Sequence, residues 1–122
     1  MPKILIVDDD PASIKLVNGI LMNNGFETVS AVDGLDALVK IKNDKPDLVV
    51  LDIMMPEING YDVCYQLRFN NEFEKLPILL LTKREQELDA RITERVNMEY
   101  VPKPLDTADF LRKINKLLSK GR

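Results

Sequence analysis

The sequence contains no histidine, no tryptophan and only one cysteine, Cys64. A disulfide framework needs a second cysteine, and Cys/His zinc sites and Ser-His or Cys-His catalytic pairs need histidine. Disulfide frameworks, Cys/His zinc sites and Ser-His or Cys-His catalytic pairs are therefore excluded within this sequence. Any acid or nucleophile that the chain uses for chemistry is expected to be a carboxylate, and Cys64 is expected to be a small core residue.

Long apolar runs and an excess of positive charge are also absent. The 17 basic and 20 acidic residues give a formal net charge of -3, which supplies no electrostatic footprint for a nucleic-acid backbone. Near the N-terminus only four apolar residues separate Lys3 from Asp8, too few for a signal peptide or a membrane span. We therefore expect a cytoplasmic protein that binds neither nucleic acid nor membrane directly.

The residues that are present suffice for one compact domain, which we expect to comprise residues 1–122. The chain has 122 residues and 45% of them are hydrophobic, as an ordinary core requires. Short apolar runs bounded by charged or turn residues predict five strands, at residues 4–7, 26–31, 48–51, 78–81 and 100–101.

The segments between and after these runs predict five helices. The first begins after Asp10 and Pro11, a favourable cap and first helical position, and the fourth is a charged segment over residues 84–96. In the second, third and last helices the apolar positions expected to face the core are Leu35, Leu38 and Ile41, then Val63, Cys64 and Leu67, and finally Phe110, Leu111, Ile114, Leu117 and Leu118.

Strands that alternate with helices predict an α/β fold, a doubly wound five-stranded parallel sheet of the flavodoxin-like kind. Parallel strands are buried on both faces, which agrees with their nearly continuous apolar runs. A common strand order for such a sheet is 2-1-3-4-5, and ligands bind beyond the carboxyl ends of the strands where the order reverses. We expect the reactive residues at that edge.

Polar residues follow four of the predicted strands. Asp8 and Asp9 follow the first, Asp52 the third, Thr82 the fourth and Lys103 the fifth. In the order 2-1-3-4-5 the first and third strands are neighbours, so the three carboxylates converge and attract a hard divalent cation such as Mg²⁺. A carboxylate beside Mg²⁺ can accept a phosphoryl group whose oxygens are held by a hydroxyl and an ammonium, which Thr82 and Lys103 offer.

This ordered series of motifs resembles the receiver domains of bacterial response regulators. Residues 4–11 resemble the family's acidic-pair strand and residues 46–52 its acceptor strand. The remaining family positions are filled by Met55, Pro56 and Gly60 in the following loop, by Thr82, and by Lys103 with Pro104. One Asp pair alone would be weak evidence, whereas this series in this order is specific.

The resemblance implies that Asp52 is the phosphoacceptor in a Mg²⁺-dependent reaction. Asp9 and Asp52 would ligate the ion directly, and Asp8 would help through water. The backbone carbonyl of Met54 would complete the ligands that the protein supplies. The phosphoryl donor implied by the family is a histidine kinase or a phosphotransfer protein, and the chain would act as a switch rather than as an enzyme.

The resemblance also implies how the site would be read. Thr82 and Lys103 would hold the phosphoryl oxygens, and the Lys103-Pro104 bond would be cis. Tyr100 would swing between exposed and buried positions when Thr82 moves. The altered surface would be that of the fourth helix, the fifth strand and the fifth helix.

Homodimerisation through that surface is a further hypothesis. Asp109 and Lys113 lie one turn apart on the last helix and match the acid and base positions that pair across the dimer in the subfamily with DNA-binding outputs. On the fourth helix Arg91, Glu94 and Arg95 are candidate partners.

The chain departs from the family pattern in three places. Lys83 follows Thr82 where a small residue is usual, residues 96–99 lack the usual glycine-containing turn, and Met54 stands two residues after the acceptor. Met54 and Arg84 would flank the path of a water that attacks the phosphoryl group. Because a thioether is a weak acceptor and a guanidinium cannot accept a proton, we expect a long-lived phosphoryl group.

Two other functions fit part of the pattern. A haloacid-dehalogenase-type phosphatase uses an Asp-x-Asp after its first strand, here Asp8 and Asp10, but leaves Asp52 unexplained. A phosphatase would turn over and fail with Asp8→Asn, whereas a receiver would be modified once and fail with Asp52→Asn. A degenerate receiver would dock to partners without phosphorylation, and the complete acidic set with Thr82 and Lys103 argues against it.

Overall fold

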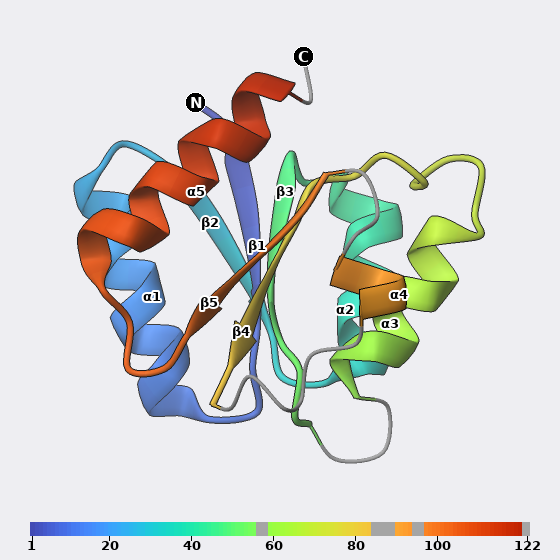
Figure 1. Ribbon diagram of the computed structural model, residues 1–122, viewed down its shortest axis with the longest axis horizontal. Coiled ribbons are helices and arrows are strands. Elements are labelled where there is room, and N and C mark those ends of the chain that lie inside the picture. Colours follow the sequence, from blue (N-terminus) through green and yellow to red (C-terminus); the bar gives the residue numbers. More distant parts are fainter. Residues whose placement is uncertain (56–58, 84–89, 94–96, 121–122) are drawn as a thin grey trace.

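The computed structural model describes residues 1–55, 59–83, 90–93 and 97–120 and has a parallel sheet at its centre (Figure 1). Its five strands are β1 (Lys3–Val7), β2 (Glu27–Ala31), β3 (Leu48–Asp52), β4 (Ile78–Thr82) and β5 (Met98–Pro102). Every neighbouring pair is parallel, and the order is β2-β1-β3-β4-β5. The predicted strand order is confirmed, with β1 and β3 side by side where the order reverses.

Helices cover both faces of this sheet. Among the described residues, the helices of nine or more residues are α1 (Pro11–Asn23), α2 (Gly34–Asp44), α3 (Gly60–Arg68) and α5 (Thr107–Lys120). Figure 1 shows α1 and α5 on one face and α2 and α3 on the other. Where the sequence predicts a helix over residues 84–96, the described part is the single turn α4 (Ala90–Thr93). Four helices, rather than the predicted five, are therefore described with more than one turn.

Local signals in the sequence fix where helices begin. At α1 the Asp10 side chain accepts a hydrogen bond from the backbone N–H of Ala12 at 3.0 Å, and Pro11 takes the first helical position. The predicted cap is therefore confirmed. At α3 the side chains of Asn59 and Asp62 cap each other's backbone N–H groups, a reciprocal arrangement that fixes the entry to this helix. None of the described helices has both the length and the apolar character that a membrane span needs.

Two apolar clusters hold the sheet between its helices. In β3, Val49 and Leu51 join the cluster formed with α2 and α3, whereas Leu48 and Val50 join the cluster formed with α1 and α5. This alternation follows from the period of two in a strand. The predicted core position Cys64 is fully buried in the first cluster. Because both faces are packed, the carboxyl ends of the strands are held in fixed register.

The predicted core face of α2 is partly wrong. Leu35 was expected inside but is 56% exposed, while Ala37 and Ile41 are buried at 0% and 1%. Since successive helix residues are about 100° apart, Leu35 lies well around the helix from the face centred on Ala37 and Ile41. The small Ala37 lets the helix sit close to the sheet, and the sequence prediction did not include this position in the core face.

Candidate functional site

The strand register brings the predicted polar residues to one edge of the sheet. Asp52 ends β3 opposite Leu81 of β4, and Thr82 ends β4 opposite Pro102 of β5. Lys103 follows directly, and its backbone N–H donates to the carbonyl of Thr82 at 2.7 Å. Because all five strands run the same way, their carboxyl ends form a single rim, and these side chains stand on it.

Three carboxylates form a cluster on this rim. Asp8, Asp9 and Asp52 each offer a carboxylate oxygen, and these oxygens all lie within 4.8 Å of one another. Asp8 and Asp52 are almost fully buried, whereas Asp9 is exposed. Asp8 also accepts a hydrogen bond from the backbone N–H of Asp10 at 3.0 Å, which orients its carboxylate. The strand order thus places three negative charges where they repel one another.

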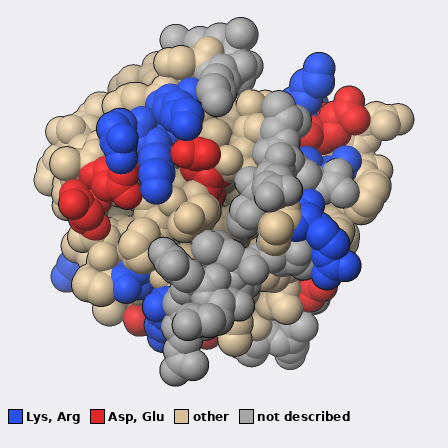
Figure 2. Space-filling view, viewed as in Figure 1, with Lys and Arg blue, Asp and Glu red and all other residues tan. Residues whose placement is uncertain are grey.

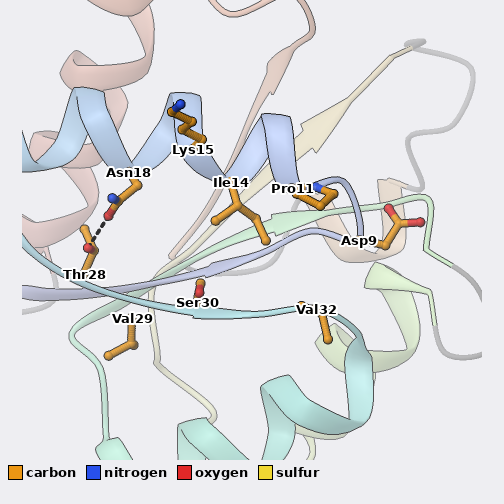
Figure 3. Close-up of a pocket in the computed structure, with 9 residues that line it drawn as sticks. All are labelled: Asp9, Pro11, Ile14, Lys15, Asn18, Thr28, Val29, Ser30 and Val32. Carbon is orange, nitrogen blue, oxygen red and sulfur yellow. Dashed lines mark hydrogen bonds between the residues drawn. The ribbon is translucent and has the colours of Figure 1, made fainter.

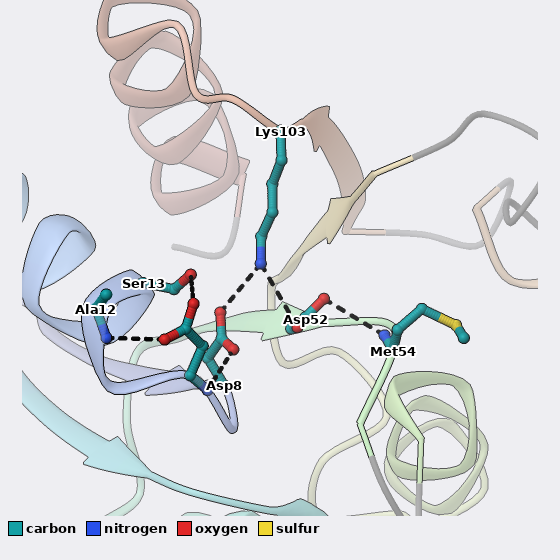
Figure 4. Close-up of polar contacts among 7 residues, drawn as sticks. Asp8, Ala12, Ser13, Asp52, Met54 and Lys103 are labelled. Carbon is teal, nitrogen blue, oxygen red and sulfur yellow. Dashed lines mark hydrogen bonds and ion pairs between the residues drawn. The ribbon is translucent and has the colours of Figure 1, made fainter.

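The side chain of Lys103 contacts two of these three carboxylates. Its ammonium Nζ lies 3.2 Å from Oδ2 of Asp8 and 3.5 Å from Oδ2 of Asp52, and only 17% of its side chain is exposed. Figure 4 shows the lysine reaching from the loop after β5 to both carboxylates. The Lys103–Pro104 peptide bond is cis, as the resemblance implied. The Lys103 ammonium is therefore close to the carboxylates of Asp8 and Asp52 at the same time.

The electrostatics of Asp52 follow from this packing. Burial raises the pKa of Asp52 to about 6, and the neighbouring Asp8 carboxylate acts in the same direction. Lys103 and the backbone N–H of Met54, which donates to Oδ1 of Asp52 at 3.3 Å, lower that pKa. The carboxylate is thus held in a dry position where a further positive charge stabilises its ionised form.

Gly60, the first residue of α3, packs against the backbone of Asp52. A Cβ at Gly60 would lie 2.6 Å from the backbone oxygen of Asp52 and 2.8 Å from Cα of Ile53. The Gly60 N–H donates to the carbonyl of Ile53 at 2.8 Å, so α3 starts in direct contact with the end of β3. From sequence Gly60 was only one residue of a motif, and the structure shows that the glycine is needed for this close approach.

The remaining predicted residues lie around the cluster at different depths. Thr82 is fully buried at the end of β4, and Tyr100 on β5 is 36% exposed. Met54 is 56% exposed, and its side chain points away from Asp52 in Figure 4. Arg84 lies outside the described residues, and so do Pro56, Glu94 and Arg95.

A hollow of about 440 Å³ between α1 and β2 begins beside the exposed Asp9. Figure 3 shows Asp9 at one end of this hollow and, at the other, the hydrogen bond from the Thr28 hydroxyl to the Asn18 side chain. Lys15 also lines it. Asp9 is thus the member of the acidic cluster that meets open space.

The donor set suits a hard divalent cation. All three acidic ligands are carboxylates, which magnesium and calcium prefer, and the soft thiolate of Cys64 is buried elsewhere in the core. With Lys103 set against two of the three acids, the cluster keeps two formal negative charges. A doubly charged cation offsets these, and it would also favour ionised Asp52 against the effect of burial.

Comparison with known proteins identifies the family. The family model for the response regulator receiver domain matches residues 4–115. The transcriptional regulatory protein PhoP of alkaline phosphatase synthesis, from Bacillus subtilis, is 34% identical over 120 residues, which are 98% of this chain and 49% of PhoP. Protein PilH of Pseudomonas aeruginosa is 33% identical over 98% of this chain and 99% of PilH. The chain thus spans about half of one relative and nearly all of the other.

A solved structure agrees with these sequence matches. The CheY-like response regulator receiver domain protein from Methanospirillum hungatei has a TM-score of 0.84 and 31% identity, covering 98% of this chain and 96% of that one. Fold, strand-end residues and sequence matches all point the same way. The chain belongs to the response regulator receiver family.

Proposed function

We propose that the chain is a phosphorylation switch in which Asp52 accepts a phosphoryl group from a histidine kinase or a phosphotransfer protein, with Mg²⁺ bound. The observation that carries this proposal is the position of Asp52, buried at the end of β3 between two further carboxylates and the Lys103 ammonium. A carboxylate with no role beyond the solvated surface would not be buried among other charged groups in this way.

The residues that would hold the ion are Asp9 and Asp52 directly, Asp8 through water and Met54 through its backbone carbonyl. When bound, Mg²⁺ supplies positive charge to the phosphoryl oxygens and offsets the repulsion among the acids. Asp8 is already fixed by Lys103 and by the N–H of Asp10, so it is oriented before any ligand arrives. A preformed cluster of this kind needs little rearrangement to bind.

The transfer itself is a displacement at phosphorus. A carboxylate oxygen of Asp52 forms the new O–P bond as the P–N bond to the donor histidine breaks, and the histidine leaves with the electron pair. Lys103 and the Thr82 hydroxyl would donate to the phosphoryl oxygens. Hydrolysis later returns phosphate and free Asp52, so the group marks a state of the protein, and we regard the chain as a switch and not as an enzyme for a separate substrate.

The phosphatase alternative is not favoured. Its second acid would be Asp10, whose carboxylate accepts the Ala12 N–H at 3.0 Å and the Ser13 hydroxyl at 3.3 Å as a helix cap. Asp10 is therefore engaged with its own helix and is not placed to exchange protons with a substrate. The complete set of acids, lysine and threonine likewise favours a phosphorylated receiver over a degenerate docking domain.

We further propose that residues 1–122 form one receiver domain whose output surface is α4, β5 and α5, with homodimerisation as one use of it. Within one chain Asp109 and Lys113 pair with each other, with Nζ 3.3 Å from Oδ2, so pairing across a dimer would require both to exchange partners. Light scattering of the beryllofluoride-activated protein tests this, and a monomer at high concentration would count against the dimer.

Treatment with acetyl phosphate and Mg²⁺, followed by intact mass measurement, tests the phosphoacceptor proposal. We expect a single added phosphoryl group that is lost in Asp52→Asn and in excess EDTA. Asp10→Asn is the matched control, because asparagine also caps helices, and it should still be modified. A phosphoryl group that persists in Asp52→Asn, or that disappears in Asp10→Asn, would overturn the proposal.

A further inference from the structure

Lys113 on α5 makes three contacts with two residues. Its ammonium Nζ donates to the backbone carbonyl of Tyr100 at 2.7 Å and lies 3.3 Å from the carboxylate of Asp109. The same nitrogen stands 5.3 Å from the centroid of the Tyr100 ring. Only 22% of the lysine side chain is exposed, so it is held in place, unlike most surface lysines.

The contact crosses the free edge of the sheet. Neighbouring strand residues face opposite sides, and Val101 belongs to the apolar cluster formed with α5. The Tyr100 side chain therefore faces the opposite side, the same one as Met98, which belongs to the cluster formed with α3. Lys113 must reach around β5 to meet it.

The backbone of β5 explains where the two sides meet. The Asn97 carbonyl and the Lys103 N–H both bond to β4, so the backbone groups of odd-numbered residues point toward β4 and those of Tyr100 point away from the sheet. Among the described strands β5 lies at the edge of the sheet, and no other described strand pairs with its outward carbonyls. Lys113 covers the carbonyl of Tyr100, and this contact also hinders backbone pairing of β5 with a strand of another chain.

The three contacts respond differently to the orientation of the Tyr100 ring. The carbonyl of Tyr100 belongs to the backbone, and Asp109 lies on the same helix as Lys113, so neither contact changes when the ring rotates. The attraction between ammonium and ring exists only while the ring lies beside Lys113. A contact shifts an equilibrium only by the difference it makes between two states, and here that difference is the cation–π contact alone.

We propose that Lys113 is a positioning residue that holds Tyr100 in its exposed orientation. The inference rests on the proposed function in one respect, since it treats Tyr100 as the residue that reports phosphorylation at Asp52. A cation–π contact at a partly exposed site is worth enough to change the ratio of exposed to inward rings about 2- to 5-fold. The lysine thus sets how readily the unphosphorylated domain visits the inward orientation.

Labelling with 3-fluorotyrosine gives a direct readout of the ring. The chain has three tyrosines, and Tyr100→Phe assigns the resonance of Tyr100. Broadening of that resonance by a soluble paramagnetic reagent measures its exposure. The variants are Lys113→Met, which keeps the aliphatic stem without the charge, Lys113→Arg, which keeps the charge, and the control Lys116→Met. Lys116 lies on the same helix as Lys113, and its ion pair is with Glu99 of β5.

We expect Lys113→Met to reduce the broadening of the Tyr100 resonance and to raise the rate of phosphorylation by acetyl phosphate about 2- to 5-fold. Lys113→Arg should resemble the unmodified protein, and so should Lys116→Met. Unchanged exposure of Tyr100 in Lys113→Met, or an equal change in Lys116→Met, would refute the positioning role. If no variant is phosphorylated while the ring still moves in Lys113→Met, the positioning role stands and the phosphoacceptor proposal fails.

The surface around Lys113 makes the control informative. Figure 2 shows basic and acidic side chains gathered over α5. Arg112 on this helix pairs with Asp109, and Lys116 lies 3.4 Å from Glu99 of β5. Removing either Lys113 or Lys116 lowers the charge of the same surface by one. A general electrostatic effect would therefore appear in both variants, whereas the contact with the ring is lost in only one.

Discussion

Gly60 and Gly19 should respond in opposite directions to the same substitution by alanine. At Gly60 a Cβ would meet the backbone oxygen of Asp52 at 2.6 Å and Cα of Ile53 at 2.8 Å. At Gly19, inside α1, no described heavy atom other than the nearby backbone of the helix itself and the two chain neighbours lies within 4 Å of the added carbon. The two positions differ in space and not in the chemistry of the change.

The magnitudes follow from these distances. Ordinary contact begins at 3.4 Å, so at Gly60 the backbone must give by the difference between 3.4 Å and 2.6 Å, about 0.8 Å. Both near atoms are backbone and cannot rotate away, and overpacking of this kind costs about 1–3 kcal/mol of unfolding free energy. In contrast, Gly19→Ala removes the entropy cost of a helical glycine and should stabilise the fold by about 0.5–1 kcal/mol.

Urea unfolding followed by circular dichroism measures both changes, provided that the slope of free energy against urea concentration is the same for all three proteins. The displaced backbone in Gly60→Ala is that of Asp52, so we also expect slower phosphorylation by acetyl phosphate, whereas Gly19→Ala should keep the normal rate. A Gly60→Ala protein as stable as the parent, or a less stable Gly19→Ala protein, would refute the reasoning.

Two further predictions concern the core and the lifetime of the phosphoryl group. Burial raises the pKa of the Cys64 thiol to about 12, so at pH 8 the thiolate is on the order of a thousandfold rarer than in an exposed cysteine. A thiol reagent should therefore modify Cys64 only after denaturant is added, and prompt modification of the native protein would contradict this. Replacing Met54 by Asn and Arg84 by Glu should speed loss of the phosphoryl group several-fold, because the introduced asparagine and glutamate can hold and activate a water. The decay is measured after the donor is removed with Mg²⁺ held constant, and an unchanged decay would show that this pair does not set the lifetime.

Much of the site could be predicted from sequence because it depends on strand order. The apolar runs fix five parallel strands, and the order 2-1-3-4-5 then brings Asp8, Asp9 and Asp52 together whatever the details of the helices. The Asp10 cap could also be predicted, since an aspartate directly before a proline is a typical start of a helix. Such features rest on backbone topology and local chemistry alone.

Other features depend on how close two elements come, which no pattern of residue types records. The burial of Ala37 in place of Leu35 follows from a helix that sits close to the sheet. The need for glycine at position 60 follows from its distance to Asp52. The contact of Lys113 with Tyr100 depends on the path of one side chain around the edge of β5, whereas the match to family positions suggested a partner for Lys113 in another chain.

The identity of the phosphorylated residue tests the central claim most directly. After treatment with acetyl phosphate and Mg²⁺, borohydride reduces an aspartyl phosphate to homoserine and releases phosphate, which marks the position for peptide mass mapping. The geometry of the acidic cluster and Lys103 predicts homoserine at position 52 and nowhere else. Homoserine at Asp8, or no conversion in any peptide of a protein that has gained a phosphoryl group, would contradict it.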